Sequence, residues 1–370
     1  MSVTLEQLAQ AAGVSVSTIS RALNDSKHAV NKKTRKRILA LAEKMGYRPN
    51  LVARGLKTER THTIGIIIDD IASPFGPIIT RGIQDYLKEY GYFSVLINGD
   101  WNPEAEIQAI HDLISRSIDG IIFVESWLRE AHPALDLASK PYVFVHRLFS
   151  GVPHHSVGVD EQYGARLAIQ HLVQLGHRRI AYINGPRGWY AAKQRLIGYR
   201  KTLAEYGIPF NLELVLGGNW EIQSAYPATR RLLELRERPT AIFAANDLMA
   251  LGAIYTVRQA GLRVPEDIAV VGYDDREIAC LSQPSLTTVR MPCYEMGQAS
   301  AKLLLRLLDK HPGPFDSQES LDEAKSANPI KIRGQLIVRE SCGAEEAQMS
   351  AAAYASDTQL AHSGMSRNRP

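Results

Sequence analysis

Cysteine is scarce in this chain, which holds only Cys280, Cys293 and Cys342 among its 370 residues. An odd number of thiols, with no C-x-x-C pair, argues against a disulfide framework and against a zinc knuckle. Long hydrophobic runs are missing too, because no stretch approaches the ~18 apolar residues that a membrane helix needs. The sequence therefore predicts no metal, no disulfide scaffold and no membrane-embedded segment.

Signals for export and for catalysis are also absent. The N-terminus lacks the basic-then-apolar order of a secretion signal, which predicts a cytoplasmic protein. The patterns G-x-G-x-x-G, G-x-x-x-x-G-K-[ST], H-E-x-x-H and G-x-S-x-G do not occur. We therefore expect a protein that is not an enzyme and that needs no cofactor.

The chain is long enough for two or three domains, and its positive charge is concentrated at one end. Residues 1–60 hold 12 Lys and Arg against 4 Asp and Glu, a net charge of +8, whereas residues 61–370 hold 31 against 35, a net charge of −4. A compact basic module on a mildly acidic body predicts a polyanionic partner for the module and a separate task for the body.

The basic module has the helix start and stop signals of a helix-turn-helix motif. Thr4-Leu5-Glu6-Gln7 forms a capping box before a helix over about 4–12, Gly13 ends that helix, and Ser15 precedes a second helix over 16–23. A third helix is predicted over about 32–45. The second helix turns Val16, Ser17, Ser20 and Arg21 outward, where they suit the major groove of DNA, and the third offers Lys33 and Arg35 to phosphates.

The runs Val3–Ala9 and Ala12–Asn24 resemble the headpiece of the LacI/GalR family of bacterial transcription regulators, and Gly46–Asn50 with Ala53–Lys57 is similar to that family's hinge. The resemblance implies that the hinge becomes a short helix on operator DNA and that Leu56 wedges into the minor groove. A leucine in a linker that packs against the body is the alternative for Leu56. The candidate DNA contacts are Thr4, Val16, Ser17, Thr18, Ser20, Arg21, Lys33, Arg35, Arg54 and Leu56.

From Thr63 onward short apolar runs alternate with helical stretches, which predicts parallel sheets covered on both faces. The fold class is an all-α helix-turn-helix headpiece plus an α/β periplasmic-binding-protein-like body of two doubly wound parallel-sheet lobes. The two lobes follow from the apolar runs, and the likeness to periplasmic binding proteins is what the resemblance implies. The expected domains are 1–48 (headpiece), 49–60 (hinge), 61–343 (body) and 344–370 (a disordered tail). Within the body we expect an N-terminal lobe of about 61–160 and 291–322, and a C-terminal lobe of about 161–290 and 323–343.

Ligands of open α/β sheets bind beyond the carboxyl ends of the strands, here between the lobes. The resemblance puts effector contacts at Phe75, His146, Arg195, Trp220, Asn246 and Asp274. An indole against a sugar ring, with Asp, Asn and Arg on the hydroxyl groups, suits a carbohydrate. Each position also has a structural alternative: core packing for Phe75 and Trp220, a helix cap for Asn246 and Asp274, and a salt bridge for Arg195.

His146 departs from the family pattern, in which many sugar-binding members have an aspartate. A carboxylate that chelates hydroxyl groups is therefore missing there, which leaves room for a phosphorylated or acidic sugar. His146 as a wall residue without a ligand bond is the alternative.

The sequence predicts a homodimeric transcription regulator, a repressor of pseudo-palindromic double-stranded operator DNA, controlled by a small sugar-like effector. One alternative is the same fold responding to a nucleobase or to a phosphoprotein partner. Another is a sugar-binding transport protein, which residues 1–60 oppose because they occupy the place of an export signal.

Overall fold

The computed structural model describes residues 3–23, 30–47, 60–125, 140–146, 155–308 and 329–344. It divides into two compact units, Met1–His62 and Thr63–Pro370, which we call the headpiece and the body. Arg54, Leu56, residues 312–328 and the predicted tail after residue 344 lie outside the described residues.

The headpiece consists of α1 (Leu5–Ala12), α2 (Val16–Leu23) and α3 (Lys32–Lys44). The predicted capping box is confirmed, since the Thr4 hydroxyl accepts from the Gln7 N–H while the Gln7 side chain accepts from the Thr4 N–H. Gly13 adopts φ 63°, a left-handed conformation that suits glycine, and its N–H bonds the last carbonyls of α1. Leu8, Ile19, Ala22 and Ile38 form the buried centre of this small unit.

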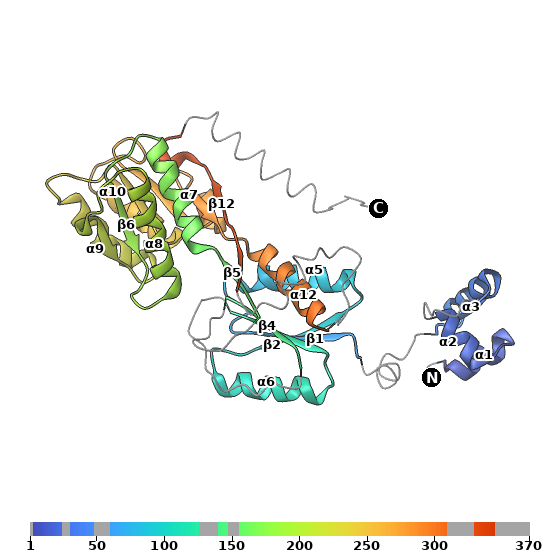
Figure 1. Ribbon diagram of the computed structural model, residues 1–370. Coiled ribbons are helices and arrows are strands. Elements are labelled where there is room, and N and C mark those ends of the chain that lie inside the picture. The colour runs from blue at the N-terminus through green and yellow to red at the C-terminus, as the bar shows by residue number, and fades with distance from the viewer. Residues whose placement is uncertain are drawn as a thin grey trace. The chain divides into compact units, whose positions relative to one another are not determined.

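The N-terminal lobe is built on a six-stranded parallel sheet of order β11-β5-β4-β3-β1-β2 (Figure 1). Helices α5 and α12 cover one face and α6 covers the other. Strand β1 is buried along nearly its whole length, as a strand covered on both faces must be. The elements are β1 (Thr63–Ile68), α5 (Gly76–Glu89), β2 (Phe93–Asn98), α6 (Pro103–Ser115), β3 (Gly120–Val124), β4 (Tyr142–Val145), β5 (Ser156–Val159), α12 (Cys293–Leu308) and β11 (Ile330–Ile332).

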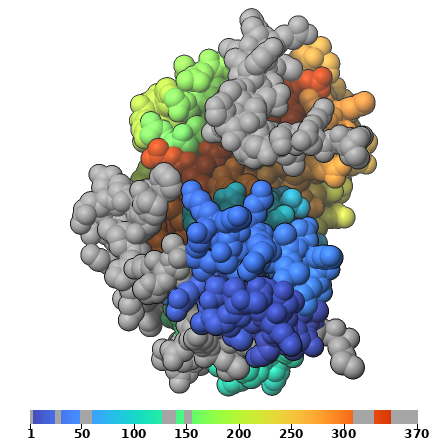
Figure 2. All heavy atoms as spheres, turned by 90° about the vertical axis from the view of Figure 1, so that its right-hand side faces the viewer, coloured from blue at the N-terminus to red at the C-terminus, as the bar shows by residue number. Residues whose placement is uncertain are grey.

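The C-terminal lobe repeats this plan with the order β12-β10-β9-β8-β6-β7, in which only the β10–β12 pairing is antiparallel. Figure 2 shows this lobe in green to orange above the light blue to cyan N-terminal lobe. Its elements are α7 (Glu161–Gln174), β6 (Ile180–Asn184), α8 (Tyr190–Glu205), η1 (Leu212–Leu214), β7 (Val215–Gly217), α9 (Ile222–Leu233), β8 (Ala241–Ala244), α10 (Asp247–Gln259), β9 (Ala269–Asp274), α11 (Glu277–Leu281), β10 (Thr287–Arg290), β12 (Gln335–Ile337) and η2 (Glu340–Cys342).

The chain passes between the lobes after β5, after β10 and after β11. We expected the last passage near residue 323, and that boundary is wrong, because Ile330–Ile332 still pairs with β5 in the N-terminal lobe. The first and last passages are joined by the Asp160 N–H, which donates to the Ile332 carbonyl at 2.9 Å. This short strand has a lysine between two isoleucines, so the sequence shows no continuous apolar run there.

Helices α5 and α12 cross at two glycines. A Cβ on Gly82 would come within 2.1 Å of the Tyr294 carbonyl oxygen, and one on Gly297 within 2.1 Å of the Ile79 carbonyl oxygen. The two backbones therefore lie closer together than any side chain would permit.

Gly82→Ala should force α5 and α12 apart and destabilise the protein by about 1–3 kcal/mol, the usual effect of overpacking a core. Gly158→Ala is the matched control, because a Cβ there meets nothing within 4 Å and its φ is not positive. Urea unfolding of both variants measures the difference. Equal free energies of unfolding in the two variants would mean that α5 and α12 can move apart without loss of stability.

Candidate functional site

The exposed face of α2 carries the predicted base-reading side chains. Val16, Ser17 and Arg21 are exposed, whereas Ile19 and Ala22 of the same helix are buried. This division follows the helical repeat, which places residues three and four apart on one side. The headpiece therefore presents a polar surface with one arginine on its second helix, the arrangement that a major groove admits.

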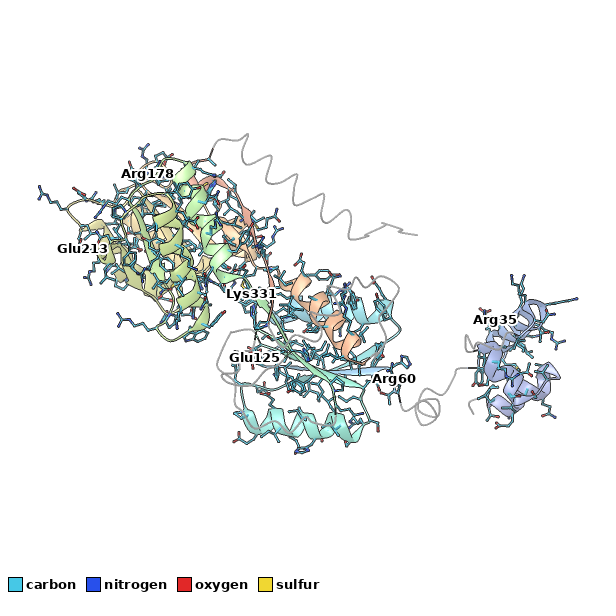
Figure 3. The ribbon with its side chains drawn as sticks, viewed as in Figure 1. Arg35, Arg60, Glu125, Arg178, Glu213 and Lys331 are labelled. Carbon is cyan, nitrogen blue, oxygen red and sulfur yellow. The ribbon has the colours of Figure 1, made fainter. Side chains whose placement is uncertain are left out.

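Several other predicted DNA contacts hold the headpiece together in this structure. Thr4 caps α1, and the Thr18 hydroxyl lies 2.8 Å from the Ser15 hydroxyl, which in turn accepts from the Thr18 N–H. Arg35 Nε donates to the Ala22 carbonyl at 3.2 Å and thereby ties α3 to the end of α2 (Figure 3). Lys33 is exposed on α3 and remains the plainest candidate for a phosphate.

A pocket between the lobes brings all six predicted effector residues together. It encloses about 380 Å³ of empty space, part of it open to solvent, and its lining comprises Phe75, His146, Glu161, Trp189, Ala191, Arg195, Trp220, Asn246, Asp274 and Met291. Phe75 and His146 come from the N-terminal lobe, and Met291 lies on the passage that follows β10. A ligand in this pocket touches both lobes.

Arg195 organises the base of the pocket. Its Nε donates to Glu161 Oε2 at 2.8 Å, its Nη1 donates to the Ala245 carbonyl, and Nη1 lies 3.8 Å from Asp274 Oδ1. The guanidinium also lies over the Tyr273 ring, with Cζ 3.6 Å from the ring centroid. Burial lowers the pKa of Arg195, but Glu161, Tyr273 and Asp274 together outweigh that effect and the pKa rises. Arg195 is therefore a fixed positive charge, and the salt bridge that we weighed as the alternative for it is present.

A hydrogen bond joins the Asn246 side chain to the backbone of Trp220. Asn246 Oδ1 caps α10 by accepting from the Met249 N–H at 2.9 Å, and its Nδ2 donates to the Trp220 carbonyl at 2.8 Å. The Trp220 ring meets Trp189 edge-on, with centroids 5.9 Å apart. A Cβ on Gly185 would lie 2.3 Å from the Trp220 ring, so only glycine leaves room for the indole. The cap that we weighed as an alternative for Asn246 is real, and it positions the indole.

Left-handed backbone marks three of these positions. His146 has φ 69°, Trp220 has φ 74° and Asp274 has φ 113°. Residues other than glycine rarely adopt such positive φ angles. Where they do, the surrounding structure holds the backbone in that conformation at a cost of about 1–3 kcal/mol each. Their gathering around one pocket is typical of a ligand site.

Charge in the pocket is shaped by burial. Burial lowers the pKa of His146 to about 4, with Glu161 opposing and Arg195 adding to the effect, so the imidazole is neutral at pH 7. Burial, with Asp247 and Glu161, raises the pKa of Asp274 well above its usual range although Arg195 opposes it. Both ring nitrogens of His146 are buried, and neither has a hydrogen-bond partner among the residues that the structure describes.

Sequence reasoning missed Glu161, Trp189, Ala191 and Met291. Glu161 is the first residue of α7, and acids at that position usually serve the helix dipole alone, so its sequence signal is weak. Only the packing of α7 against α8 brings its carboxylate to Arg195.

A three-helix headpiece with an exposed recognition helix, joined to a two-lobed body with a pocket at the strand ends, defines a DNA-binding transcription regulator. Comparison with family models agrees with this class. Residues 4–50 match the model described as bacterial regulatory proteins, lacI family, and residues 169–342 match a periplasmic binding protein-like domain. The chain belongs to the LacI family.

Relatives cover nearly the whole chain. Catabolite control protein A of Priestia megaterium is 35% identical over 312 residues, 84% of this chain and 94% of its own. The regulator CelR of Thermobifida fusca is 38% identical over 349 residues, 91% and 98% of the two chains. Among solved structures, a lac repressor dimer bound to operator and the anti-inducer ONPF matches with TM-score 0.72 and 31% identity, covering 93% of this chain and 100% of that one. A CelR–cellobiose complex matches with TM-score 0.63 and 33% identity, covering 92% and 99%.

These relatives are transcription regulators. Within the described residues no helix is long and apolar enough to cross a bilayer. The described part of the chain likewise holds no cluster of three or more His, Cys, Asp or Glu side chains arranged for a metal ion.

His146 should make the folded protein acid-sensitive. Because its pKa is about 4 when folded and near 6.5 when unfolded, only the unfolded chain takes the proton between these values, and stability is lost as the pH falls from 6.5 to 4. The free energy of unfolding should fall by up to about 3 kcal/mol relative to a His146→Gln variant over that range. Urea titrations at several pH values measure the difference. His111→Gln is the control, because His111 is exposed on α6. A constant difference from pH 7 to pH 4 would contradict the burial effect.

Proposed function

We propose that this protein binds a pseudo-palindromic operator as a homodimer, represses transcription there, and changes its operator affinity when an uncharged sugar-like molecule occupies the pocket between the lobes. The observation that carries the proposal is the convergence of Phe75 and His146 from one lobe with Arg195, Trp220, Asn246 and Asp274 from the other. A ligand alters an equilibrium only through different affinities for its two states, and one that touches both lobes meets this condition.

An uncharged ligand suits the electrostatics of the pocket. Among the described lining residues Arg195 is the only cation, and Glu161 already engages its Nε and Nη2. A phosphate group would therefore lie near the acids Glu161 and Asp274. The cation of this described lining, Arg195, is already paired with Glu161. Sugar hydroxyl groups, in contrast, donate and accept, which matches the neutral imidazole of His146 and the carboxyl group of Asp274. The solved CelR relative is in complex with cellobiose, a neutral sugar.

The headpiece supplies the DNA contacts in this proposal. Val16 and Arg21 face base edges, Ser17 and Ser20 face base edges or phosphates, Lys33 and Arg35 face phosphates, and Leu56 of the hinge enters the minor groove. Further DNA contacts are Thr4, Thr18 and Arg54. The charge of the first sixty residues supports this role, and operator DNA as the partner places the work of the protein in the cytoplasm. We assign no catalytic role to any residue.

A second copy of the chain is the partner that the exposed apolar side chains of the body support. Ile71, Ile78 and Phe93 are exposed on the N-terminal lobe, and Tyr255, Ile278 and Leu281 are exposed on the C-terminal lobe. These side chains are candidates for a contact with the second copy, and a two-fold dimer carries two headpieces to the two halves of a palindrome.

Arg21→Ala and Lys33→Ala should weaken DNA binding in different ways. Loss of Arg21 should cost about 1–3 kcal/mol on the preferred operator and blur the preference at one base pair. Loss of Lys33 should weaken binding to all DNA alike and flatten the salt dependence. Fluorescence-anisotropy titrations of operator and scrambled duplexes at several salt concentrations separate the two. An unchanged operator preference in Arg21→Ala would remove that side chain from the reading face.

Asp274→Asn tests the effector site. The variant should keep operator affinity within about threefold in the absence of sugar and should lose the effector response, for which a typical coupling is about 1–3 kcal/mol. Operator titrations with and without each sugar that raises the melting temperature of the wild-type protein measure this. Glu266→Gln, an exposed acid on the same lobe, is the control. Loss of operator binding without any sugar would show that Asp274 is structural.

A further inference from the structure

The turn that follows β9 holds Asp274 in an unusual backbone conformation. Asp274 and Asp275 are consecutive residues with φ angles of 113° and 56°, which residues other than glycine rarely adopt. The Asp274 carboxyl group lines the effector pocket, 3.8 Å from Arg195 Nη1, while the Asp274 carbonyl accepts from the Met291 N–H. Such a conformation persists only where the surrounding structure imposes it, so the contacts of this turn decide where the Asp274 carboxyl group lies.

Asp275 supplies two charged contacts of this turn. Its Oδ2 accepts from Arg290 Nε at 2.7 Å, and its Oδ1 accepts from Arg339 Nη2 at 2.6 Å. The Asp275 side chain is 6% exposed, whereas the side chains of Arg290 and Arg339 are 40% and 18% exposed. Hydrogen bonds between ionised groups are stronger than neutral ones, and burial of the carboxylate limits screening by water. Loss of this charge would therefore release a restraint on the turn.

The two arginines connect this turn to the passages between the lobes. Arg290 is the last residue of β10, directly before the second passage, and Arg339 follows β12, which the last passage enters. Arg290 also pairs with Gln335 of β12, and a Cβ on Gly334 would lie 2.6 Å from the Arg290 carbonyl oxygen. The second and last passages thus lie against each other at Arg290, whose side chain bonds the Asp275 carboxylate.

A second acid holds the other end of the turn. The carboxylate of Asp247, which is fully buried, accepts from the Arg276 N–H at 2.7 Å and from the Thr288 hydroxyl group at 2.5 Å. Asp247 begins α10, so these two bonds fix the turn to α10 and to β10. The bonds of Asp275, in contrast, lead to the residues that border the passages.

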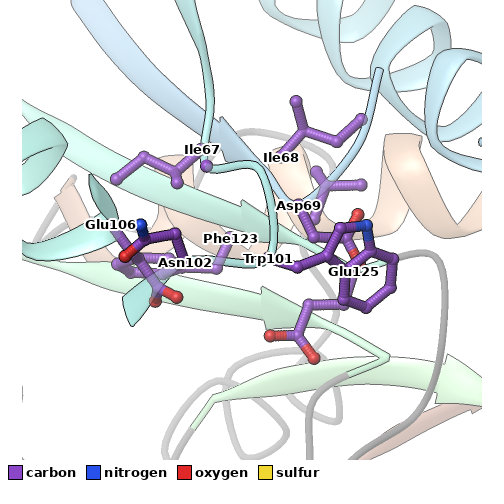
Figure 4. A pocket seen from close by; sticks show the side chains of 10 residues that line it. Ile67, Ile68, Asp69, Trp101, Asn102, Glu106, Phe123 and Glu125 are labelled. Atoms are coloured by element: carbon purple, nitrogen blue, oxygen red, sulfur yellow. The ribbon is translucent and has the colours of Figure 1, made fainter. Parts of the chain in front are cut away.

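The acids at the strand ends of the N-terminal lobe have different surroundings. Asp69 and Glu125 are buried there beside a small pocket, and Figure 4 shows Trp101 and Glu125 on one side of it and Asn102 and Glu106 on the other. The described lining of this pocket contains no arginine or lysine and shares no residue with the effector pocket. This small pocket is therefore not part of the contacts that join Asp274 to the passages.

We propose that Asp275 is a positioning residue for the effector response. Its carboxylate holds the turn of Asp274 against Arg290 and Arg339, and through these ion pairs a molecule bound at Asp274 acts on the passages between the lobes. Asp275 does not line the pocket, so it works through Asp274 and not by contact with the effector. This inference rests on the proposed function, since it names the residue through which the effector pocket acts on the rest of the body.

The test separates sugar binding from the operator response in the full-length protein. The probes are cellobiose, galactose and ribose. Calorimetry measures their affinity without DNA, and fluorescence anisotropy measures operator affinity with and without each probe. A probe that changes the operator affinity of the wild-type protein about tenfold should change that of Asp275→Asn less than about twofold, while its own affinity for the variant stays within about threefold.

Asp267→Asn is the matched control. Asp267 pairs with Arg263 on the same lobe, but this pair lies on the surface, so the variant should keep the whole response. Operator binding without sugar within about threefold of the wild-type value shows that each variant folds.

The partner arginine provides a second set of variants. Arg339→Gln should reduce the response as Asp275→Asn does, and Arg339→Lys, which retains a cation, should keep part of it. The double variant of Asp275→Asn and Arg339→Gln should respond like either single variant, because both changes remove one interaction. If Asp275→Asn does not bind the operator, Arg339→Gln and Arg339→Lys decide the question.

A full response in Asp275→Asn and Arg339→Gln would overturn this inference while the sugar-responsive regulator stands. A loss of sugar affinity as large as the loss of response would also overturn it, because Asp275 would then only support the pocket. If no probe changes the operator affinity of the wild-type protein, the sugar-responsive function fails and this inference fails with it.

Discussion

The buried ion pair between Arg195 and Glu161 fixes the geometry on which the effector pocket depends. Glu161 begins α7 immediately after the chain leaves the N-terminal lobe, and Arg195 lies on α8. A buried pair gains little net stability because desolvation offsets the attraction, but removing one partner leaves an uncompensated charge. The pair therefore holds α7 and α8 in one arrangement and keeps Asp274, Tyr273 and the Trp220 indole around a single guanidinium.

The passages between the lobes lie beside this cluster. Asp160 precedes Glu161 and bonds the Ile332 backbone, and Met291 lines the pocket while its N–H donates to the Asp274 carbonyl at 3.3 Å. Asp275 adds ion pairs to Arg290 and Arg339 at 2.7 and 2.6 Å. The pocket thus lies next to the passages that connect the lobes, and Met291 belongs both to its lining and to one of these passages.

The apolar runs after Thr63 from which the sequence predicted parallel sheets coincide with eight of the strands, β1 to β4 and β6 to β9. It missed β5, β10, β11 and β12, because these short strands mix polar residues or glycine with apolar ones and so give no continuous apolar run. The six effector positions emerged only with the family resemblance, since one arginine, one asparagine and one aspartate far apart in the chain have no local signal. Glu161 had only a weak signal, because the packing of α7 against α8, which a sequence does not show, brings its carboxylate to Arg195.

Local patterns by themselves determined the headpiece. Its capping box, its Gly13 turn and the apolar spacing within each of its helices act over a few residues, so a linear sequence contains them completely. Tertiary structure alone decided which charges are paired, which histidine is neutral and where the last passage between the lobes lies. These properties depend on desolvation and on contacts between residues such as Arg195 and Glu161, or Asp160 and Ile332, that only the packed sheets bring together.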